Sequence, residues 1–89
     1  MKHAGAAALE RLEPLLRTLR AIAPLKERSS GVFYFKSKAF LHFHEDPAGL
    51  FADIRAHPNA KFDRLKVDED AGQTTLLEIV RKATDPDRR

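Results

Sequence analysis

The segment from Gly31 to Ala56 constrains the fold more than any other part of this 89-residue chain. Aromatic and β-branched residues recur with a period of two through two stretches, Val32 to Phe35 and Ala39 to Glu45. A Lys-Ser-Lys group separates these stretches, and Asp-Pro-Ala-Gly follows the second one. Period-two alternation interrupted by turn-forming residues is typical of antiparallel strands joined by short turns. The segment therefore predicts a three-stranded antiparallel meander.

Two amphipathic segments flank this meander. Before it, leucines at spacings of three and four residues predict a helix over about residues 6–23. Pro14 lies inside this helix and either kinks it or begins a second helical segment. After the meander, a second apolar stripe predicts a helix over about residues 70–84, with Arg81 and Lys82 in its last turn, where basic side chains suit the helix dipole. Residues 85–89 are expected to form a frayed tail.

These elements predict a single α+β domain over residues 1–89, with the meander occupying about residues 31–67. The expected order is α-β-β-β-(β)-α, in which residues 61–67 alternate enough to form a fourth strand, either paired or unpaired. Residues 26–31 are polar and predict a connector. Because each helix must bury its apolar stripe, both helices are expected on one face of the antiparallel sheet, in a two-layer sandwich.

The polarity of the strands predicts their register. If Asp-Pro-Ala-Gly is a four-residue loop, Glu45 opposes Leu50, and the apolar side chains gather on the face that the helices cover. A three-residue turn over residues 36–38 adds Phe33 and Phe35 to that face. The opposite, open face then carries the following residues: Tyr34, Phe40, His42, His44 and Phe51.

This open face is unusually aromatic for one that contacts only water. It predicts a partner surface that includes Tyr34, Phe40, Phe51 and Arg55. An open sheet edge is an alternative route to a homodimer. The function expected first is therefore a non-enzymatic protein-interaction or homodimerising module.

His42, His44 and Asp46 form a His-x-His-x-Asp pattern that projects from one face of a single strand. Two histidines at this spacing can turn their ring nitrogens toward one ion. The pattern predicts, as an alternative function, a metal site formed by these three residues. Outside this alternative no cofactor is predicted. An enzyme is disfavoured, because no nucleophile, phosphate-binding loop or oxyanion arrangement accompanies the acidic residues.

The predicted register also places His42 directly opposite Asp53, within reach of a charge-assisted hydrogen bond. A carboxylate partner favours the imidazolium form of a histidine. The sequence therefore predicts that the pKa of His42 is raised above that of free histidine.

The net charge of +3 is unevenly distributed along the chain. Residues 1–40 carry eight basic and three acidic side chains, whereas residues 41–89 carry eight basic and ten acidic ones. A basic segment attracts polyanions through its long-range field. The second alternative function is nucleic-acid binding through the basic N-terminal half, with these contacts: Arg17, Arg20, Lys26, Arg28, Lys36 and Lys38.

The chain contains no cysteine, which excludes disulfides and zinc–cysteine sites. A secreted domain of this size ordinarily needs disulfides, so their absence favours the reducing cytoplasm. No stretch approaches the ~20 apolar residues of a membrane-spanning helix. Charges at Glu10, Arg11 and Glu13 disfavour a signal peptide. A cytoplasmic location without a membrane partner is expected.

The run Ala-Phe-Leu-His-Phe-His-Glu-Asp-Pro-Ala-Gly-Leu-Phe-Ala-Asp-Ile, over residues 39–54, resembles the central hairpin of small bacterial proteins of unknown function. These proteins carry no known activity. The resemblance therefore implies a bacterial domain and no particular function.

Overall fold

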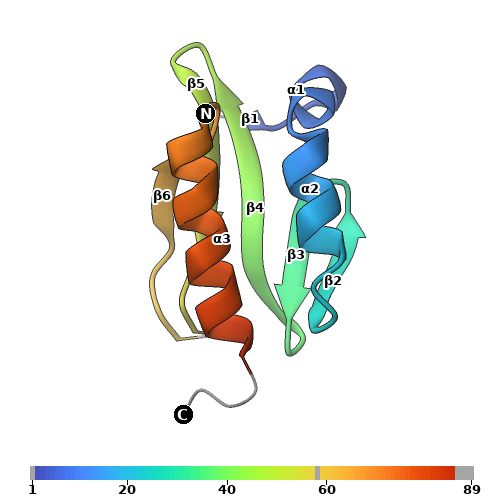
Figure 1. The fold of residues 1–89 in the computed structure, drawn as a ribbon. Helices are drawn as coiled ribbons and strands as arrows, with labels where there is room; N and C mark the ends of the chain where they lie inside the picture. Colours follow the sequence, from blue (N-terminus) through green and yellow to red (C-terminus); the bar gives the residue numbers. More distant parts are fainter. Residues whose placement is uncertain (1, 58, 86–89) are drawn as a thin grey trace.

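The computed structural model describes residues 2–57 and 59–85. Its elements are, in chain order, β1 (Lys2–His3), α1 (Ala6–Arg11), α2 (Glu13–Arg20), β2 (Leu25–Ser29), β3 (Val32–Phe35), β4 (Lys38–Asp46), β5 (Gly49–Ile54), β6 (Asp63–Lys66) and α3 (Asp70–Thr84). The strands form one antiparallel sheet in the order β2-β3-β4-β5-β6, and β1 pairs with the end of β4. The predicted α+β class is confirmed (Figure 1). Residues 86–89 of the predicted tail lie outside the described residues.

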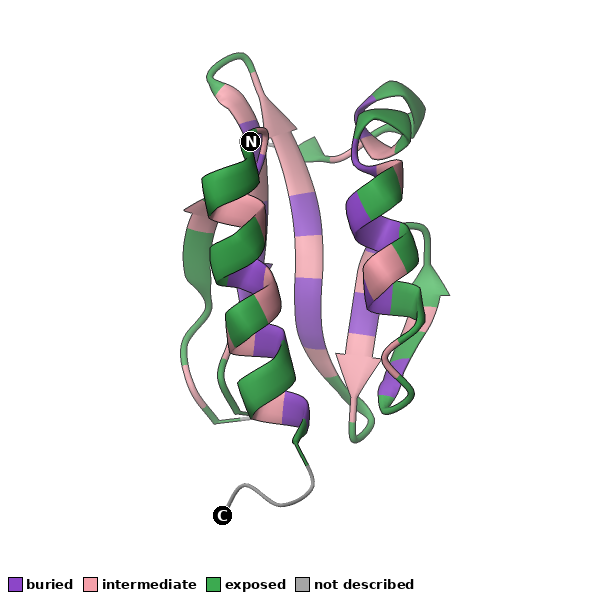
Figure 2. Cartoon of the chain, viewed as in Figure 1, coloured by how far each residue is buried: buried purple, intermediate pink, exposed green. Residues whose placement is uncertain are grey.

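The helices lie over the same face of the sheet, with α2 near β2 and β3, and α3 near β5 and β6 (Figure 1). One continuous core fills the space between the two layers. Its fully buried large side chains come from helices, strands and two connecting residues, Leu12 and Val67: Leu12, Leu16, Leu19, Phe33, Leu41, Phe43, Ile54, Val67, Leu76 and Val80. The outward sides of the helices are exposed (Figure 2). No described helix is long and apolar enough to cross a membrane.

The N-terminal helical region contains two helices where the sequence predicts one over residues 6–23. Helices α1 and α2 meet at Leu12, and α2 ends at Arg20. Pro14 lies in the first turn of α2, where its missing N–H group costs no hydrogen bond. Pro14 therefore lies at the beginning of a second helix and does not kink a single one.

Two strands are present that the alternation does not predict. β1 consists of two residues only, and β2 occupies part of the predicted connector. Leu25 is the one buried side chain of β2, so this strand has no apolar pattern of its own and depends on pairing with β3. At the other side of the sheet, residues 63–66 pair with β5, which makes the fourth strand of the predicted meander a paired one.

The predicted register between β4 and β5 is confirmed. Glu45 opposes Leu50, and His42 opposes Asp53. A one-residue shift would exchange the two faces of β4, because side chains alternate along a strand. The burial of its apolar residues therefore also fixes which residues face the histidines.

The turn between β3 and β4 has two residues rather than the predicted three. Phe35 pairs with Lys38, yet Phe33 still faces Leu41, because a bulge at Phe40 inserts one extra residue into β4. The bulge interrupts the alternation, so Phe40 and Leu41 are both buried, at 3% and 0% exposure. Phe40 therefore belongs to the core, and its predicted position on the exposed open face is wrong.

Gly72, in the first turn of α3, allows the helix to approach the backbone of β6. A Cβ atom at this position would overlap the Lys66 carbonyl oxygen, which a side-chain movement cannot relieve. Helix propensity alone would favour alanine here by about 1 kcal/mol. We expect Gly72→Ala to lower the free energy of unfolding by about 1–3 kcal/mol instead, measured by urea denaturation. Thr74→Ala, at an exposed position of the same helix, should change stability little, and a gain for Gly72→Ala would contradict the close approach.

Lys36 and Ser37 form the β3–β4 turn with positive φ angles of 54° and 66°. Turns of this type favour Asn-Gly, since residues with a Cβ atom adopt the left-handed conformation at a cost of about 1–2 kcal/mol each. We expect Lys36→Asn/Ser37→Gly to raise the free energy of unfolding by about 1 kcal/mol in urea denaturation. Ser37→Ala keeps the Cβ atom and should give no such gain; lower stability in the Asn-Gly variant would contradict the strain.

Candidate metal centre

Strand pairing brings five polar side chains to neighbouring positions on the open face of the sheet. His42 and His44 lie on β4, and Asp53 lies on β5 opposite His42. β1 places His3 opposite His44, and β6 places Arg64 opposite Asp53. Directly opposed residues of antiparallel strands project to the same side of a sheet. The register therefore assembles these residues from four strands, of which β1 is distant in sequence from the others.

Polar atoms of His42, His44 and Asp53, here called the His-Asp cluster, converge. Nδ1 of His42 lies 2.8 Å from Nε2 of His44, and that Nε2 lies 3.1 Å from Oδ2 of Asp53. One ligand atom from each residue falls within 4.8 Å of the other two. Asp53 is buried at 8% exposure, and both imidazoles are half-buried. Two imidazole nitrogens and one carboxylate oxygen so placed can coordinate one cation.

Asp46, the third ligand that the His-x-His-x-Asp pattern predicts, is not among the residues that converge. Its carboxylate accepts a hydrogen bond of 3.0 Å from the Ala48 amide, within the turn that joins β4 to β5. The carboxylate of the cluster comes from Asp53 on the neighbouring strand instead. A pattern within one strand cannot identify such a ligand, whereas the register between two strands can.

Hydrogen bonding around His44 is incomplete. Its Nε2 lies within hydrogen-bond distance of both His42 and Asp53, but a ring nitrogen offers either one proton or one lone pair. Its Nδ1 is buried and has no hydrogen-bond partner among the described residues. A buried polar atom without a partner costs about 1–3 kcal/mol. The cluster is therefore not a fully satisfied polar network of the folded chain.

Arg64 holds the Asp53 carboxylate from β6. Its Nε donates to Oδ1 at 2.8 Å, and a terminal guanidinium nitrogen donates to Oδ2 at 2.9 Å. Such a bidentate pair fixes the orientation of a carboxylate. The hydrogen bonds from Arg64, together with its charge, lower the pKa of Asp53 although burial opposes the shift. Asp53 is therefore ionised at neutral pH.

The pKa of His42 is lowered, and the raised pKa that the sequence predicts is wrong. Burial disfavours the imidazolium form most strongly, and the neighbouring His44 adds to this effect. Asp53 acts in the opposite direction, but its carboxylate pairs with Arg64 and contacts His44. His42 is therefore neutral at pH 7, with one ring nitrogen free of a proton.

The four residues predicted as a partner surface do not form one exposed patch. Phe40 is buried, while Tyr34, Phe51 and Arg55 are half-buried. Phe62, at 38% exposure, is the one exposed large apolar side chain in the described part of the chain. The outer strands β2 and β6 also carry several charged side chains, which disfavour pairing with a further strand. Self-association stays a prediction.

The six predicted nucleic-acid contacts separate onto different parts of the fold. Arg17 and Arg20 lie on α2, where both pair with Glu13. The other four belong to the sheet and its β3–β4 turn: Lys26, Arg28, Lys36 and Lys38. The basic N-terminal half is therefore not a single surface.

Neither His3 nor Arg64 is assigned a role by the sequence analysis. The role of Arg64 could have been predicted from the sequence, because pairing residues 61–67 with β5 brings a basic residue to the vicinity of Asp53. His3 carries none, since a two-residue strand has no periodicity. The ring centroid of His3 lies 5.4 Å from that of His44 and 6.0 Å from that of His42. The site thus extends to the N-terminal strand.

Comparison with known proteins gives no match: no protein-family model, no curated protein and no solved structure is similar to this chain. The geometry of the sites therefore carries the functional inference.

We expect the imidazole of His42 to titrate below the ~6.5 of free histidine in an NMR titration of its ring protons. Asp53→Asn should lower this pKa further, because it removes the charge that raises it, and His44→Gln should raise it. Because the folded-state pKa lies below the unfolded one, the folded protein binds fewer protons at His42. The neutral form of His42 therefore stabilises the folded state at pH values above the unfolded-state pKa, and this stabilisation is lost as pH falls through the folded-state pKa. A His42 pKa above that of free histidine would contradict burial as the dominant effect.

Proposed function

We propose that this protein binds a divalent transition-metal ion at the His-Asp cluster. The observation that carries the proposal is the convergence of ligand atoms from His42, His44 and Asp53 within 4.8 Å. Metal ligands must be free of protons, and a neutral His42 beside an ionised Asp53 meets this requirement at pH 7. Imidazole and carboxylate donors suit nickel, iron and zinc ions. Because the chain contains no cysteine, the site would use nitrogen and oxygen donors and no thiolate. The absence of cysteine also favours a cytoplasmic location.

Two of the donor separations are compatible with adjacent positions around one ion. At an ion about 2.1 Å from each donor, the separations of 2.8 Å and 3.1 Å correspond to angles of about 85° and 95°. A tetrahedral site would need donors about 3.4 Å apart at the same bond length. Angles near 90° are those between adjacent ligands of an octahedron, and His44 would be adjacent to both other donors. Ni²⁺, Fe²⁺ and Zn²⁺ are therefore all candidate ions for these donors.

Arg64 would act as an outer-shell residue of this site. Its bidentate pair orients the Asp53 carboxylate, and hydrogen bonds to ligating carboxylates support metal binding. Its positive charge also opposes a cation nearby, although the half-exposed guanidinium is partly screened by water. Orientation and repulsion thus act against each other, which favours reversible binding rather than a permanently occupied site.

We expect Ni²⁺ to raise the Tm of protein purified without an affinity tag and treated with a chelator. An ion that binds only the folded state stabilises it by about 2.7 kcal/mol at 100 times its Kd. Titration calorimetry should show that Asp53→Asn weakens Ni²⁺ binding about 100-fold. Removal of a residue that only hydrogen-bonds to a metal ligand typically weakens binding by about 10- to 100-fold, and loss of a ligand should cost at least as much. Asp46→Asn makes the same change of charge outside the cluster and should leave the affinity unchanged. Binding should weaken with falling pH, because protons compete for the histidine nitrogens.

His42→Gln provides an independent test, because it removes a ligand and keeps the Asp53–Arg64 pair. Its Ni²⁺ affinity should fall as far as that of Asp53→Asn, while the Tm without metal reports any loss of folding separately. Failure of Ni²⁺, Fe²⁺ and Zn²⁺ alike to bind in calorimetry or to shift the Tm would refute the proposal. A loss confined to Asp46→Asn would return the third ligand to the position that the sequence pattern predicts.

A further inference from the structure

A second polar site lies on the sheet away from the His-Asp cluster. His42 pairs with Val32 at the start of β3, whereas this site lies where β3 ends and β2 begins. It is a pocket of about 390 Å³, and its lining includes Lys26, Arg28 and Lys36. A volume of this size accommodates a small organic ligand.

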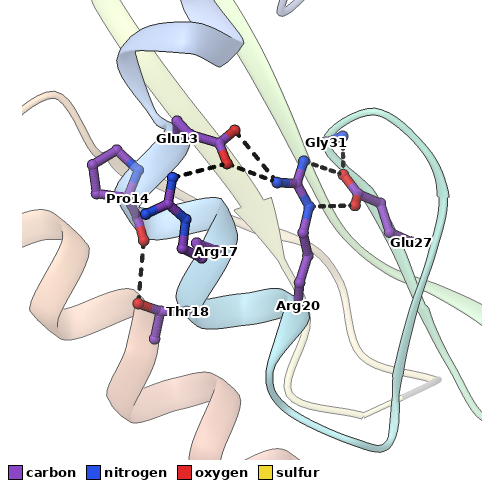
Figure 3. A network of polar contacts seen from close by, with 7 residues as sticks. All are labelled: Glu13, Pro14, Arg17, Thr18, Arg20, Glu27 and Gly31. Carbon is purple, nitrogen blue, oxygen red and sulfur yellow. Dashed lines mark hydrogen bonds and ion pairs between the residues drawn. The ribbon is translucent and has the colours of Figure 1, made fainter.

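Two of the three acidic residues of the basic N-terminal half, Glu13 and Glu27, are engaged away from this pocket. Arg20 forms a bidentate pair with Glu27, at 2.6 Å and 3.2 Å, and contacts Glu13 at 3.0 Å (Figure 3). Glu13 also contacts Arg17, and Glu27 accepts the Gly31 amide (Figure 3). Both carboxylates thus pair with arginines of α2, and neither lines the pocket.

The three cations of the pocket remain without acidic partners. Over residues 2–57 and 59–85, neither Lys26, Arg28 nor Lys36 takes part in an ion pair. Like charges gathered without compensation raise the local potential and attract anions. The pocket therefore has the charge of a site for a phosphate-bearing ligand.

Aromatic rings accompany these cations. The guanidinium carbon of Arg28 lies 5.1 Å from the centre of the Tyr34 ring, and the ammonium nitrogen of Lys36 lies 5.3 Å from the centre of the Phe35 ring. Sites for nucleic acids combine basic groups for the backbone with aromatic or guanidinium planes on which bases stack. Phosphate alone would need only the cations.

The strained turn belongs to the same pocket. Lys36 and Ser37 both line it, and both adopt positive φ angles that Asn-Gly would tolerate better. Backbone strain is concentrated at functional sites, where the residue type is set by its role and not by local stability. The turn thus presents an amine and a hydroxyl at the pocket at the expense of stability.

We propose that this pocket binds a nucleoside phosphate, with Lys26 and Lys36 contacting the phosphate and the Arg28–Tyr34 stack facing the base. The ligand chemistry can come from a free nucleotide or from one residue of a single-stranded nucleic acid. This site shares no residue with the His-Asp cluster, so the proposal is independent of metal binding.

The test uses the full chain, free of tag and metal, with two probes: uridine monophosphate and a fluorescein-labelled oligouridylate of about twelve nucleotides. Binding is followed by NMR amide shifts and by fluorescence anisotropy over a series of salt concentrations. Lys36→Asn/Ser37→Gly should weaken binding about tenfold and reduce the slope of log K against log salt by about one. Because this variant is expected to be more stable than the natural protein, weaker binding cannot be attributed to unfolding.

Arg17→Gln is the matched control, since it removes one positive charge from α2 and should leave binding unchanged. Comparable binding of the mononucleotide and the oligomer supports a free nucleotide as the ligand, whereas much tighter binding of the oligomer supports a single strand. The proposal is overturned if neither probe shifts the amide signals of the pocket at low salt. It is also overturned if Arg17→Gln weakens binding as much as the turn variant, or if heparin competes as well as the unlabelled oligomer.

Discussion

Strand β4 organises this protein, because it pairs with β1, β3 and β5 and contributes to both faces of the sheet. Leu41 and Phe43 are completely buried beneath the helices, while His42 and His44 alternate with them on the open face. A shift by one residue would expose the apolar pair and bury both histidines. The free energy that fixes the core register therefore also holds the histidines opposite the residues of β5.

The bulge at Phe40 reconciles a two-residue turn with this alternation. Without the extra residue, the turn would place Phe33 on the wrong side relative to Leu41. Two backbone carbonyl groups at the bulge accept hydrogen bonds from Arg55. Its side chain donates to the Ala39 carbonyl at 2.6 Å, and its amide donates to the Phe40 carbonyl at 3.2 Å. The irregularity is thus accommodated without unpaired carbonyl groups at these two residues.

The two faces of the sheet use charge differently. On the covered face, Arg20 and Glu27 join α2 to β2, and their hydrogen bond lowers the pKa of Glu27. Such exposed or half-exposed ion pairs contribute little to the free energy of unfolding. They neutralise the charges of Arg20 and Glu27, however, and leave the cations of the pocket without acidic partners among the described residues. No helix covers the open face, where both imidazoles are half-buried and Lys26 and Arg28 are exposed. Candidate ligand sites with different chemistry, one of nitrogen and carboxylate donors and one of cations, can therefore share one sheet.

The sequence by itself determined the elements whose side chains repeat with a period. The meander, the amphipathic helical segments and the β4–β5 register all follow from local pattern, whereas the sequence left open whether Pro14 kinks a helix or begins one. It also indicated the two histidines, because their spacing places them on one face of a strand.

Only the tertiary structure decided what the periodicity does not encode. β1 and β2 exist because they pair with neighbours, and their own residues carry no apolar alternation. Asp53 replaces Asp46 beside the histidines because side chains on adjacent strands approach each other across the ladder. The pKa of His42 is lowered rather than raised, because the effect of burial exceeds that of the Asp53 carboxylate. This carboxylate also pairs with Arg64. These outcomes depend on burial and on contacts between different strands. Both are properties of the packed molecule and not of any one segment.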